Sequence, residues 1–235
     1  MKLVAIVSWY DEPAEWLAAC CASLCQAGVG HIVAVDGAYE AYPQGSVYPR
    51  SGAEQYAAIT ETCHAMQAGS TVYGPGSAWR GNEVEKRSYA FRLAELVADP
   101  GDWYWVMDAD QVVNTKTSDG LLDTLAIADV DVAETWLYER NALNDPTRAS
   151  IRNLFRAIPG LRVVGNHYTY MTPDGRFLWG DGGPSRLEPS LVTSVEVEHR
   201  TWLRPRARRD KQNDYYRRRD MTQAEHMVVD MEVTF

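Results

Sequence analysis

The first half of the chain alternates apolar runs of strand length with amphipathic runs of helix length, and this alternation constrains the fold more than any other feature. Four apolar or β-branched runs predict strands, at 2–9, 31–35, 70–74 and 103–107. Three segments with apolar residues at helical spacing predict the helices between them, at 12–28, 53–69 and 82–98. Such alternation predicts an α/β fold with a mixed, mostly parallel central sheet flanked by helices.

The pattern changes after Asn114, where short strand-like runs predominate. We predict one short helix at 121–128 and a polar closing helix at 208–228. Between them we predict four strands, at 131–139, 150–157, 160–171 and 190–202. The first two of these strands are typical of an antiparallel pair added to the sheet. Because the sequence has neither an internal repeat nor a clear linker, we predict one domain over 1–235 with two functional halves.

Composition is that of a soluble globular protein, with 46% hydrophobic and 23% charged residues in a chain of 235. No apolar run is long enough for a membrane span, and the start is unlike a signal peptide, so we expect a cytoplasmic protein. The four cysteines form no C-x-x-C pair. This predicts small buried thiols in a reducing cytosol rather than a zinc site or a disulfide framework.

Acidic residues follow three of the predicted strands. Asp11 and Glu12 come after the first strand, Asp36 after the second, and Asp108 and Asp110 after the fourth. The carboxyl ends of parallel strands meet at one edge of a sheet, where ligands bind in open α/β folds. We therefore expect these side chains to surround a ligand site.

Asp108 and Asp110 are two carboxylates separated by one residue, directly after the apolar run 103–107. Carboxylates this close repel each other unless a cation compensates them. Oxygen ligands of this kind suit Mg²⁺ or Mn²⁺, which predicts a divalent metal that holds an anionic ligand. A second D-x-D triplet, at 129–131, does not follow an apolar strand run, so we assign the metal to the first.

Charge is unevenly distributed along the chain. Residues 200–219 contain nine Arg or Lys and two Asp, a local charge of +7 in a chain whose net charge is −9. This asymmetry indicates a segment that meets anions, either the phosphates of a small ligand or a nucleic-acid backbone. A solvated basic helix would show the same composition.

The order of short motifs along the chain resembles that of the family 2-like glycosyltransferases of GT-A fold, which use nucleotide sugars and contain a D-x-D motif. The matching pieces are SWYDEP (8–13), AVDG (34–37), Trp79, EKRS (85–88), GDWYWVMDAD (101–110), RNLFRAIPGLRVVGNH (152–167) and VEVEHRTW (195–202). Each piece is short, and their shared order over most of the chain makes the resemblance specific. Departures from the family pattern include Asp11, Ser88, Gln111 and Tyr168.

This resemblance implies a single GT-A (Rossmann-like) domain with a nucleotide-sugar-binding half (1–113), an acceptor half (114–199) and a basic C-terminal helix or lid (200–235). It implies a metal-dependent, hexosyltransferase-like reaction that moves a sugar from a nucleotide-diphosphate donor, with a UDP-sugar favoured, to an acceptor hydroxyl. The acceptor stays open between a protein, a glycan, a small molecule and modified DNA.

The same resemblance implies which residues form the site. Asp108, Asp110 and His199 would hold Mn²⁺ or Mg²⁺. The predicted donor-binding residues are Ser8, Tyr10, Glu12, Asp36, Arg87, Asp108, Arg208 and Lys211. Within this set, Asp36 could accept the imide N–H of uracil, and the arginines suit phosphate. The catalytic base stays open between Asp181 and His167, because an inverting transferase needs a carboxylate or histidine beside the acceptor hydroxyl.

Two other functions are compatible with a sequence of this kind. A nucleotide-sugar pyrophosphorylase shares this type of fold, but it should have a glycine-rich loop with Lys or Arg near its start, and SWYDEPAEW (8–16) has none. A non-catalytic protein could instead use the basic C-terminal segment to bind nucleic acid or a glycan.

Overall fold

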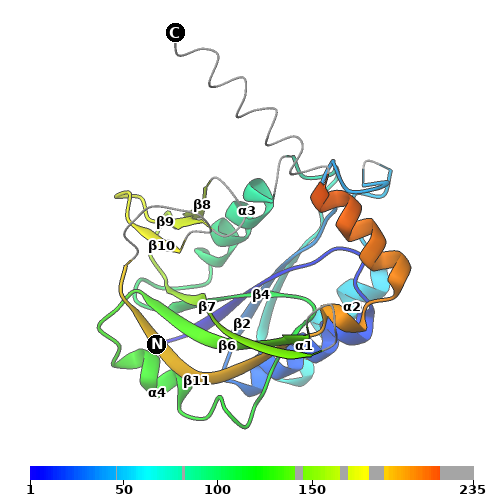
Figure 1. The fold of residues 1–235 in the computed structure, drawn as a ribbon. Helices are drawn as coiled ribbons and strands as arrows, with labels where there is room; N and C mark the ends of the chain where they lie inside the picture. Colours follow the sequence, from blue (N-terminus) through cyan, green and yellow to red (C-terminus); the bar gives the residue numbers. More distant parts are fainter. Residues whose placement is uncertain (46, 81–82, 141–144, 165–168, 180–187, 218–235) are drawn as a thin grey trace.

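The computed structural model describes residues 1–45, 47–80, 83–140, 145–164, 169–179 and 188–217. Within these residues, the strands form an eight-stranded sheet of order β3-β2-β1-β4-β7-β6-β11-β5 and a three-stranded sheet of order β10-β9-β8 (Figure 1). The larger sheet curls, and helices flank it. This arrangement confirms the predicted α/β fold with a mixed central sheet.

The first half of the large sheet is parallel. It contains β1 (Leu3–Ser8), β2 (His31–Val35), β3 (Gly69–Tyr73) and β4 (Trp103–Asp108), connected by α1 (Ala14–Gln26), α2 (Ala53–Ala65) and α3 (Val84–Ala94). Ser8 lies opposite both Val35 and Asp108 in the register. The carboxyl ends of β1, β2 and β4 are therefore level at one edge of the sheet.

The second half of the sheet reverses direction. It contains β7 (Pro146–Arg156), β6 (Val132–Arg140), β11 (Ser190–His199) and β5 (Gln111–Val113). β7 is antiparallel to β4 and β6, β11 is parallel to β6, and β5 is antiparallel to β11. The last pairing places His199 opposite Gln111, so a late part of the chain lies beside the turn that follows β4.

Two apolar layers cover the sheet, one on each face. The first is formed by alternate residues of β1 with α1, α2 and α4 (Leu121–Ala126). The second joins the other residues of β1 to α3 and to the small sheet. Because both faces of β1 are covered, all six of its residues are buried, which accounts for its unbroken apolar sequence.

Most predicted elements are present with boundaries shifted by a few residues. β5 and β10 (Phe177–Trp179) were not predicted, because three-residue strands leave too short a period in the sequence. The single strand predicted over 160–171 is wrong. The structure has β8 (Arg162–Val163) and β9 (Tyr170–Met171), which pair with each other in antiparallel fashion. The closing helix begins at 206, and its described part extends to 217.

No helix in the described part of the chain is both long and apolar enough to cross a membrane.

Gly37 has a backbone conformation that the structure requires at the end of β2. Its φ is +121°, and a Cβ there would lie 2.5 Å from both Pro75 Cγ and Trp79 Nε1. That indole nitrogen donates a hydrogen bond to the Asp36 carbonyl at 2.8 Å. A side chain at this position would therefore combine an unfavourable φ with a steric conflict inside the fold.

We expect Gly37→Ala to lower the free energy of unfolding more than Gly101→Ala does. Gly101 also has a positive φ, +93°, but a Cβ there would meet nothing within 4 Å. The Gly101 variant should therefore show only the backbone cost, about 1–2 kcal/mol. Urea denaturation of both variants measures the difference, and equal losses would show that the contacts around Gly37 are unimportant.

Candidate functional site

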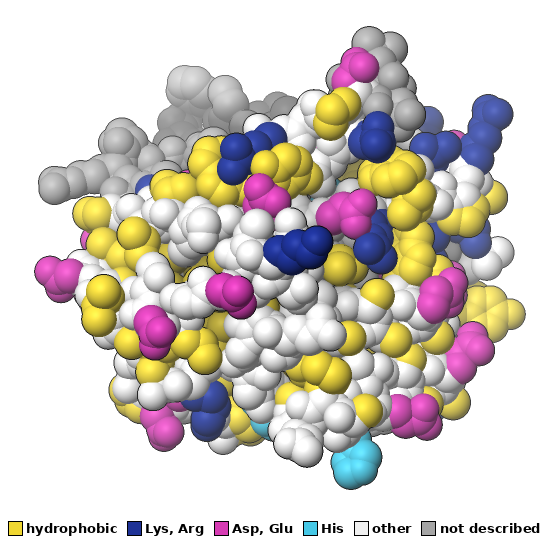
Figure 2. Space-filling view, turned by 90° about the horizontal axis from the view of Figure 1, so that it is seen from below, with side chains coloured by type: hydrophobic (Ala, Val, Ile, Leu, Met, Phe, Trp, Pro, Cys, Tyr) yellow, Lys and Arg dark blue, Asp and Glu magenta, His cyan; other side chains and the backbone are white. Residues whose placement is uncertain are grey.

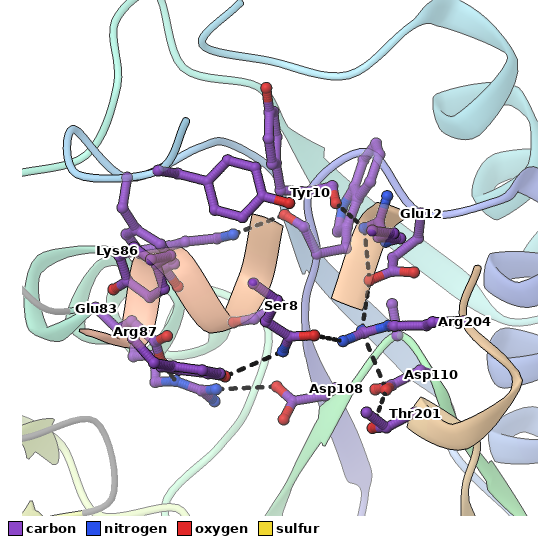
Figure 3. A pocket seen from close by; sticks show the side chains of 18 of the residues that line it. Ser8, Tyr10, Glu12, Glu83, Lys86, Arg87, Asp108, Asp110, Thr201 and Arg204 are labelled. Atoms are coloured by element: carbon purple, nitrogen blue, oxygen red, sulfur yellow. Dashed lines mark hydrogen bonds and ion pairs between the residues drawn. The ribbon is translucent and has the colours of Figure 1, made fainter. Parts of the chain in front are cut away.

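A cavity of about 280 Å³ lies at the carboxyl edge of β1 and β4 (Figure 3). Its walls come from the loop after β1, from α3, from the turn after β4 and from the C-terminal segment that follows β11. Of the residues predicted to bind the donor or a metal, eight line it: Ser8, Tyr10, Glu12, Arg87, Asp108, Asp110, His199 and Arg208.

The two aspartates occupy the turn between β4 and β5. Gln111 stabilises this turn, since its side-chain oxygen accepts a hydrogen bond from the Asp108 N–H at 3.0 Å. Arg87 Nη2 donates to Asp108 Oδ1 at 2.9 Å, and Arg87 Nε lies 3.3 Å from Glu83 Oε2. Glu83 itself stands in the left-handed region, with φ +79°, at the start of α3. Asp108 therefore faces a buried guanidinium.

Asp110 is the centre of a second group of charges. Its side chain is 1% exposed, and Oδ2 accepts a hydrogen bond from Thr201 Oγ1 at 2.8 Å. His199 Nε2 lies 3.2 Å and Arg204 Nη2 3.0 Å from the same oxygen. Burial alone would raise the pKa of Asp110, but the hydrogen bonds from His199 and Thr201 and the charge of Arg204 hold that pKa well below its usual range.

His199 connects this group to β6. Its Nδ1 lies 3.0 Å from Glu139 Oε2 at the end of that strand. Burial lowers the pKa of the imidazole, whereas the hydrogen bond and charge of Asp110 and the hydrogen bond to Glu139 raise it, to about 9 overall. The imidazole is therefore held on both ring nitrogens by carboxylates.

The spacing of Asp110 and His199 suits two ligands of a divalent ion. Adjacent ligands of an octahedral ion with bonds near 2.1 Å stand about 3 Å apart, and the two atoms are separated by 3.2 Å. Asp108 pairs instead with Arg87. In the described ranges of the chain, no cluster of three or more His, Cys, Asp or Glu could hold a metal ion. Phosphate and water would have to complete the shell.

The C-terminal segment contributes two arginines to the cavity. Glu12 Oε1 lies 2.6 Å from Arg204 Nη2 and 2.9 Å from Arg208 Nη2. Arg208 Nη2 also donates to the Tyr10 carbonyl at 2.7 Å. Arg204 thus bridges Glu12 and Asp110, a connection drawn in Figure 3. Two arginines of the basic segment, Arg204 and Arg208, thus lie against carboxylates of this edge, whereas Arg206 and Arg217 are exposed.

Several buried polar atoms of the cavity wall have no hydrogen-bond partner among the described residues. They are Ser8 Oγ, Trp9 Nε1, Glu12 Oε2 and Arg204 Nε. Buried polar atoms in folded proteins are nearly always paired, and exceptions call for an explanation. Donors and acceptors left over around one cavity are available to a polar ligand or to water.

A second cavity, of about 330 Å³, adjoins the first. It lies between β4, β6, β7 and the small sheet. Arg87, Asp108 and His199 line both cavities. The two spaces therefore meet at these three side chains.

Asp36, which the sequence predicts as a nucleobase contact, lines neither cavity. It is fully buried, and its carboxylate accepts hydrogen bonds from Ser51 N at 2.6 Å, Ser51 Oγ at 2.7 Å and Tyr56 OH at 2.6 Å. These contacts attach the following loop to the end of β2. Lys211, also predicted as a donor contact, is exposed and lines neither cavity.

The two predicted base candidates, Asp181 and His167, lie outside the described residues. Asp11, one of the departures from the motif pattern that the sequence resembles, has a φ of +51°. Asn and Asp adopt this left-handed region more readily than other side chains, so an aspartate suits the loop.

Sequence reasoning missed Thr201, Arg204, Glu139 and Lys86 as parts of the site. One signal could have identified Arg204. It precedes Arg208, Gln212 and Tyr216 at intervals of four residues, and all four line the first cavity. The helix begins at 206, so this interval places Arg208, Gln212 and Tyr216 on one of its faces, and Arg204 reaches the same cavity from the turn that precedes the helix.

Lys86 is a buried cation at the side of the first cavity. It is 1% exposed, and its ammonium donates to the carbonyls of Trp9 at 2.6 Å and Gly37 at 3.0 Å. Burial lowers its pKa to about 8, although the nearby charges of Asp36 and Glu83 act to raise it. Lys86 thereby ties together the loops that follow β1 and β2.

We expect the stability of the wild-type protein, relative to Lys86→Met, to increase as the pH rises from 8 to 10.5. In this window the folded state has lost the Lys86 proton while the unfolded chain keeps it, because the pKa of Lys86 is lowered from 10.5 to about 8. The unfolded state then binds more protons, so unfolding becomes less favourable, by about 3 kcal/mol across the window. Urea denaturation at several pH values measures this change. Lys116→Met, at an exposed lysine, is the matched control, and a flat difference for both variants would contradict the prediction.

Comparison with known proteins gives only distant likenesses. No family model matches this sequence, and no curated protein matches it. Among solved structures, residues 1–349 of S. aureus TarS are similar with a TM-score of 0.45 and 17% identity, over 67% of this chain and 47% of that one. The same fragment in complex with UDP-GlcNAc gives a TM-score of 0.44 and 17% identity, over 63% and 37%. Mannose-6-phosphate isomerase from Helicobacter pylori gives 0.37 and 12%, over 58% and 51%. This chain thus spans about half the length of these structures or less.

Proposed function

We propose that this protein is a glycosyltransferase that binds a nucleotide-diphosphate sugar in the first cavity and transfers the sugar to an acceptor hydroxyl. The observation that supports this most directly is the Asp110–His199 pair beside Arg204 and Arg208, at the carboxyl edge of the parallel strands. A diphosphate needs this combination, because its charge is neutralised by a metal ion and by arginines. The unpaired buried polar atoms of the same wall also favour a polar ligand.

The proposed metal is Mn²⁺ or Mg²⁺, held by Asp110 and His199. When bound, the ion would act as a Lewis acid that stabilises negative charge on the diphosphate. Glu139 holds His199 through Nδ1, which orients Nε2 toward Asp110. Asp108 was predicted as a metal ligand as well, but its pairing with Arg87 suits a contact with the donor ribose better.

Arg204 and Arg208 are proposed to neutralise the leaving group. As the bond between the sugar C1 and the phosphate oxygen breaks, its electron pair moves to the diphosphate, and fixed positive charge lowers the energy of that state. In the structure both arginines bind Glu12. Oxygens of a diphosphate would offer them denser negative charge, so these contacts can be exchanged on binding.

The transfer also requires that the acceptor oxygen lose its proton as it bonds to C1. Asp181 and His167 remain our proposals for the group that takes this proton. A UDP-sugar remains the proposed donor on the basis of the motif resemblance alone, since the buried Asp36 does not support a uracil contact.

The alternative of a nucleic-acid-binding protein agrees less well with the placement of the basic residues. Arg204 and Arg208 point to carboxylates of the cavity. Arg206 and Arg217 are exposed, but each is paired with an aspartate of its own helix, Asp210 or Asp214. On the face in Figure 2, Lys and Arg side chains are interspersed with Asp and Glu. A nucleic-acid backbone instead requires positive charge gathered on one face.

We expect Asp110→Asn to abolish the dependence of UDP binding on Mn²⁺, because the amide is a weaker metal ligand than the carboxylate. His199→Gln should weaken Mn²⁺ binding less, since water can take the vacated position. Electron paramagnetic resonance of free Mn²⁺ and calorimetry with UDP measure both effects. Thermal unfolding is needed alongside, because Asp110 is buried among charged partners.

The matched control for this experiment is Asp129→Asn, an exposed residue of the other D-x-D triplet. It should leave both affinities unchanged. Native UDP and Mn²⁺ affinities in a folded Asp110→Asn protein would exclude the proposed site.

We expect UDP with Mn²⁺ to protect residues 200–217 from trypsin. The reason is that Arg204 and Arg208 would exchange contacts with Glu12 for contacts with a more highly charged diphosphate. Mass spectrometry of the fragments reports cleavage at each arginine with and without ligand. Equal cleavage rates in both conditions would show that this segment is not a lid over the donor.

A further inference from the structure

The second cavity has the position of a binding site for the other reactant. It is lined by residues of β4, β6, β7, β9 and β10, and it touches the first cavity at Arg87, Asp108 and His199. Its volume of about 330 Å³ is within the range of small-molecule sites. A molecule bound there would face the boundary of the first cavity without entering it.

One wall of this cavity is apolar and aromatic. Tyr170 and Trp179 come from the small sheet, and Leu137 and Ile151 come from β6 and β7. Aromatic rings combined with a few fixed polar groups are typical of sites that bind an amphipathic ring. Trp179 is half-buried, so part of its ring stays accessible.

A polar side chain also lines this cavity: Asn153, which is 5% exposed. Its side-chain oxygen accepts a hydrogen bond from Thr135 Oγ1 at 3.1 Å. Within the described part of the chain, its amide nitrogen donates to Met107 Sδ at 4.0 Å. A thioether is a weak acceptor, so this buried amide keeps donor capacity for a ligand oxygen.

Charge in this cavity disfavours an anionic ligand. Asp108 and Glu139 place two carboxylates along it. Arg152 is committed to the fold, since it donates to Glu134 Oε1 at 3.2 Å, the Leu178 carbonyl at 2.9 Å and the Glu188 carbonyl at 2.7 Å. Arg87 is bound to Asp108. His199, the third cation of this lining, has Nδ1 3.0 Å from Glu139 Oε2. Among the described residues, each cation that lines the cavity is thus already paired with a carboxylate, so a phosphate-bearing acceptor would have to displace one of these pairs.

We propose that the second cavity binds a sugar ring as the acceptor, with its apolar face against Trp179 and Tyr170 and its hydroxyls bonded to Asn153 and Glu139. A neutral polyhydroxylated ring meets both conditions of the cavity, because it has an apolar face and many hydroxyls but no charge. This inference rests on the proposed transferase function, and it assigns the acceptor class to a glycan or glycoside rather than to a nucleic acid.

The test uses the full-length protein with methyl β-glucoside, methyl β-galactoside and methyl β-N-acetylglucosaminide as probes. Saturation-transfer NMR in the presence of UDP and Mn²⁺ reports binding of each glycoside, and calorimetry reports UDP affinity. We expect at least one glycoside to bind. Trp179→Leu and Asn153→Leu should each weaken it by about tenfold or more through the lost aromatic contact or hydrogen bond, while UDP affinity stays unchanged.

Trp136→Leu is the matched control, because Trp136 is also half-buried but stacks under Arg148 and lines neither cavity. It should retain both affinities. The proposal is overturned if UDP binds but no glycoside does, or if glycoside binding is the same in both cavity variants and the control. It is also overturned if an oligonucleotide with hydroxymethylated bases binds instead and Trp179→Leu prevents this.

The outcome for UDP is separate from the outcome for the glycosides. Failure of UDP to bind the wild-type protein would remove the proposed transferase function. Glycoside binding that the two cavity variants abolish would still establish the second cavity as a sugar site. Trp179→Leu and Asn153→Leu give two independent readings, so a folding defect in one variant does not prevent a result.

Discussion

The buried carboxylate of Asp110 is the contact on which the arrangement of this site depends. It lies at the turn between β4 and β5, yet its partners come from the end of β11 and from the segment beyond it. A carboxylate that is 1% exposed must be paired with positive charge or hydrogen-bond donors. Satisfying Asp110 therefore brings His199, Thr201 and Arg204 to the edge of a sheet whose other strands end nearby.

Most charges of the first cavity are paired with other side chains of the protein. Arg87 is paired with Asp108, Arg204 with Glu12 and Asp110, and Arg208 with Glu12. Such pairs limit the cost of holding charge in a partly buried space, because each ion has a counterion at contact distance. A diphosphate and a divalent cation introduce opposite charges together, so they can enter this network without leaving a net unpaired charge.

The division into two cavities follows from the reversal of strand direction in the sheet. The parallel strands β1 to β4 end at one edge and build the first cavity there. β6 and β7 continue the sheet as an antiparallel pair whose side chains, with the small sheet, build the second. Arg87, Asp108 and His199 stand between them. Two binding spaces separated by one row of charged side chains suit a reaction between two substrates.

The sequence by itself determined the α/β class and most elements, because apolar runs and helical periodicity are local signals that span whole strands and helices. It also predicted Asp108, Asp110 and His199 as site residues, through strand ends and motif order, and all three line the first cavity. Only the tertiary structure decided that the Asp36 carboxylate accepts hydrogen bonds from Ser51 and Tyr56. It also decided that Arg204 rather than Lys211 reaches the first cavity. The physical reason is that charge and residue type are visible in a sequence, whereas the partner of a buried charge depends on segments far apart in the chain.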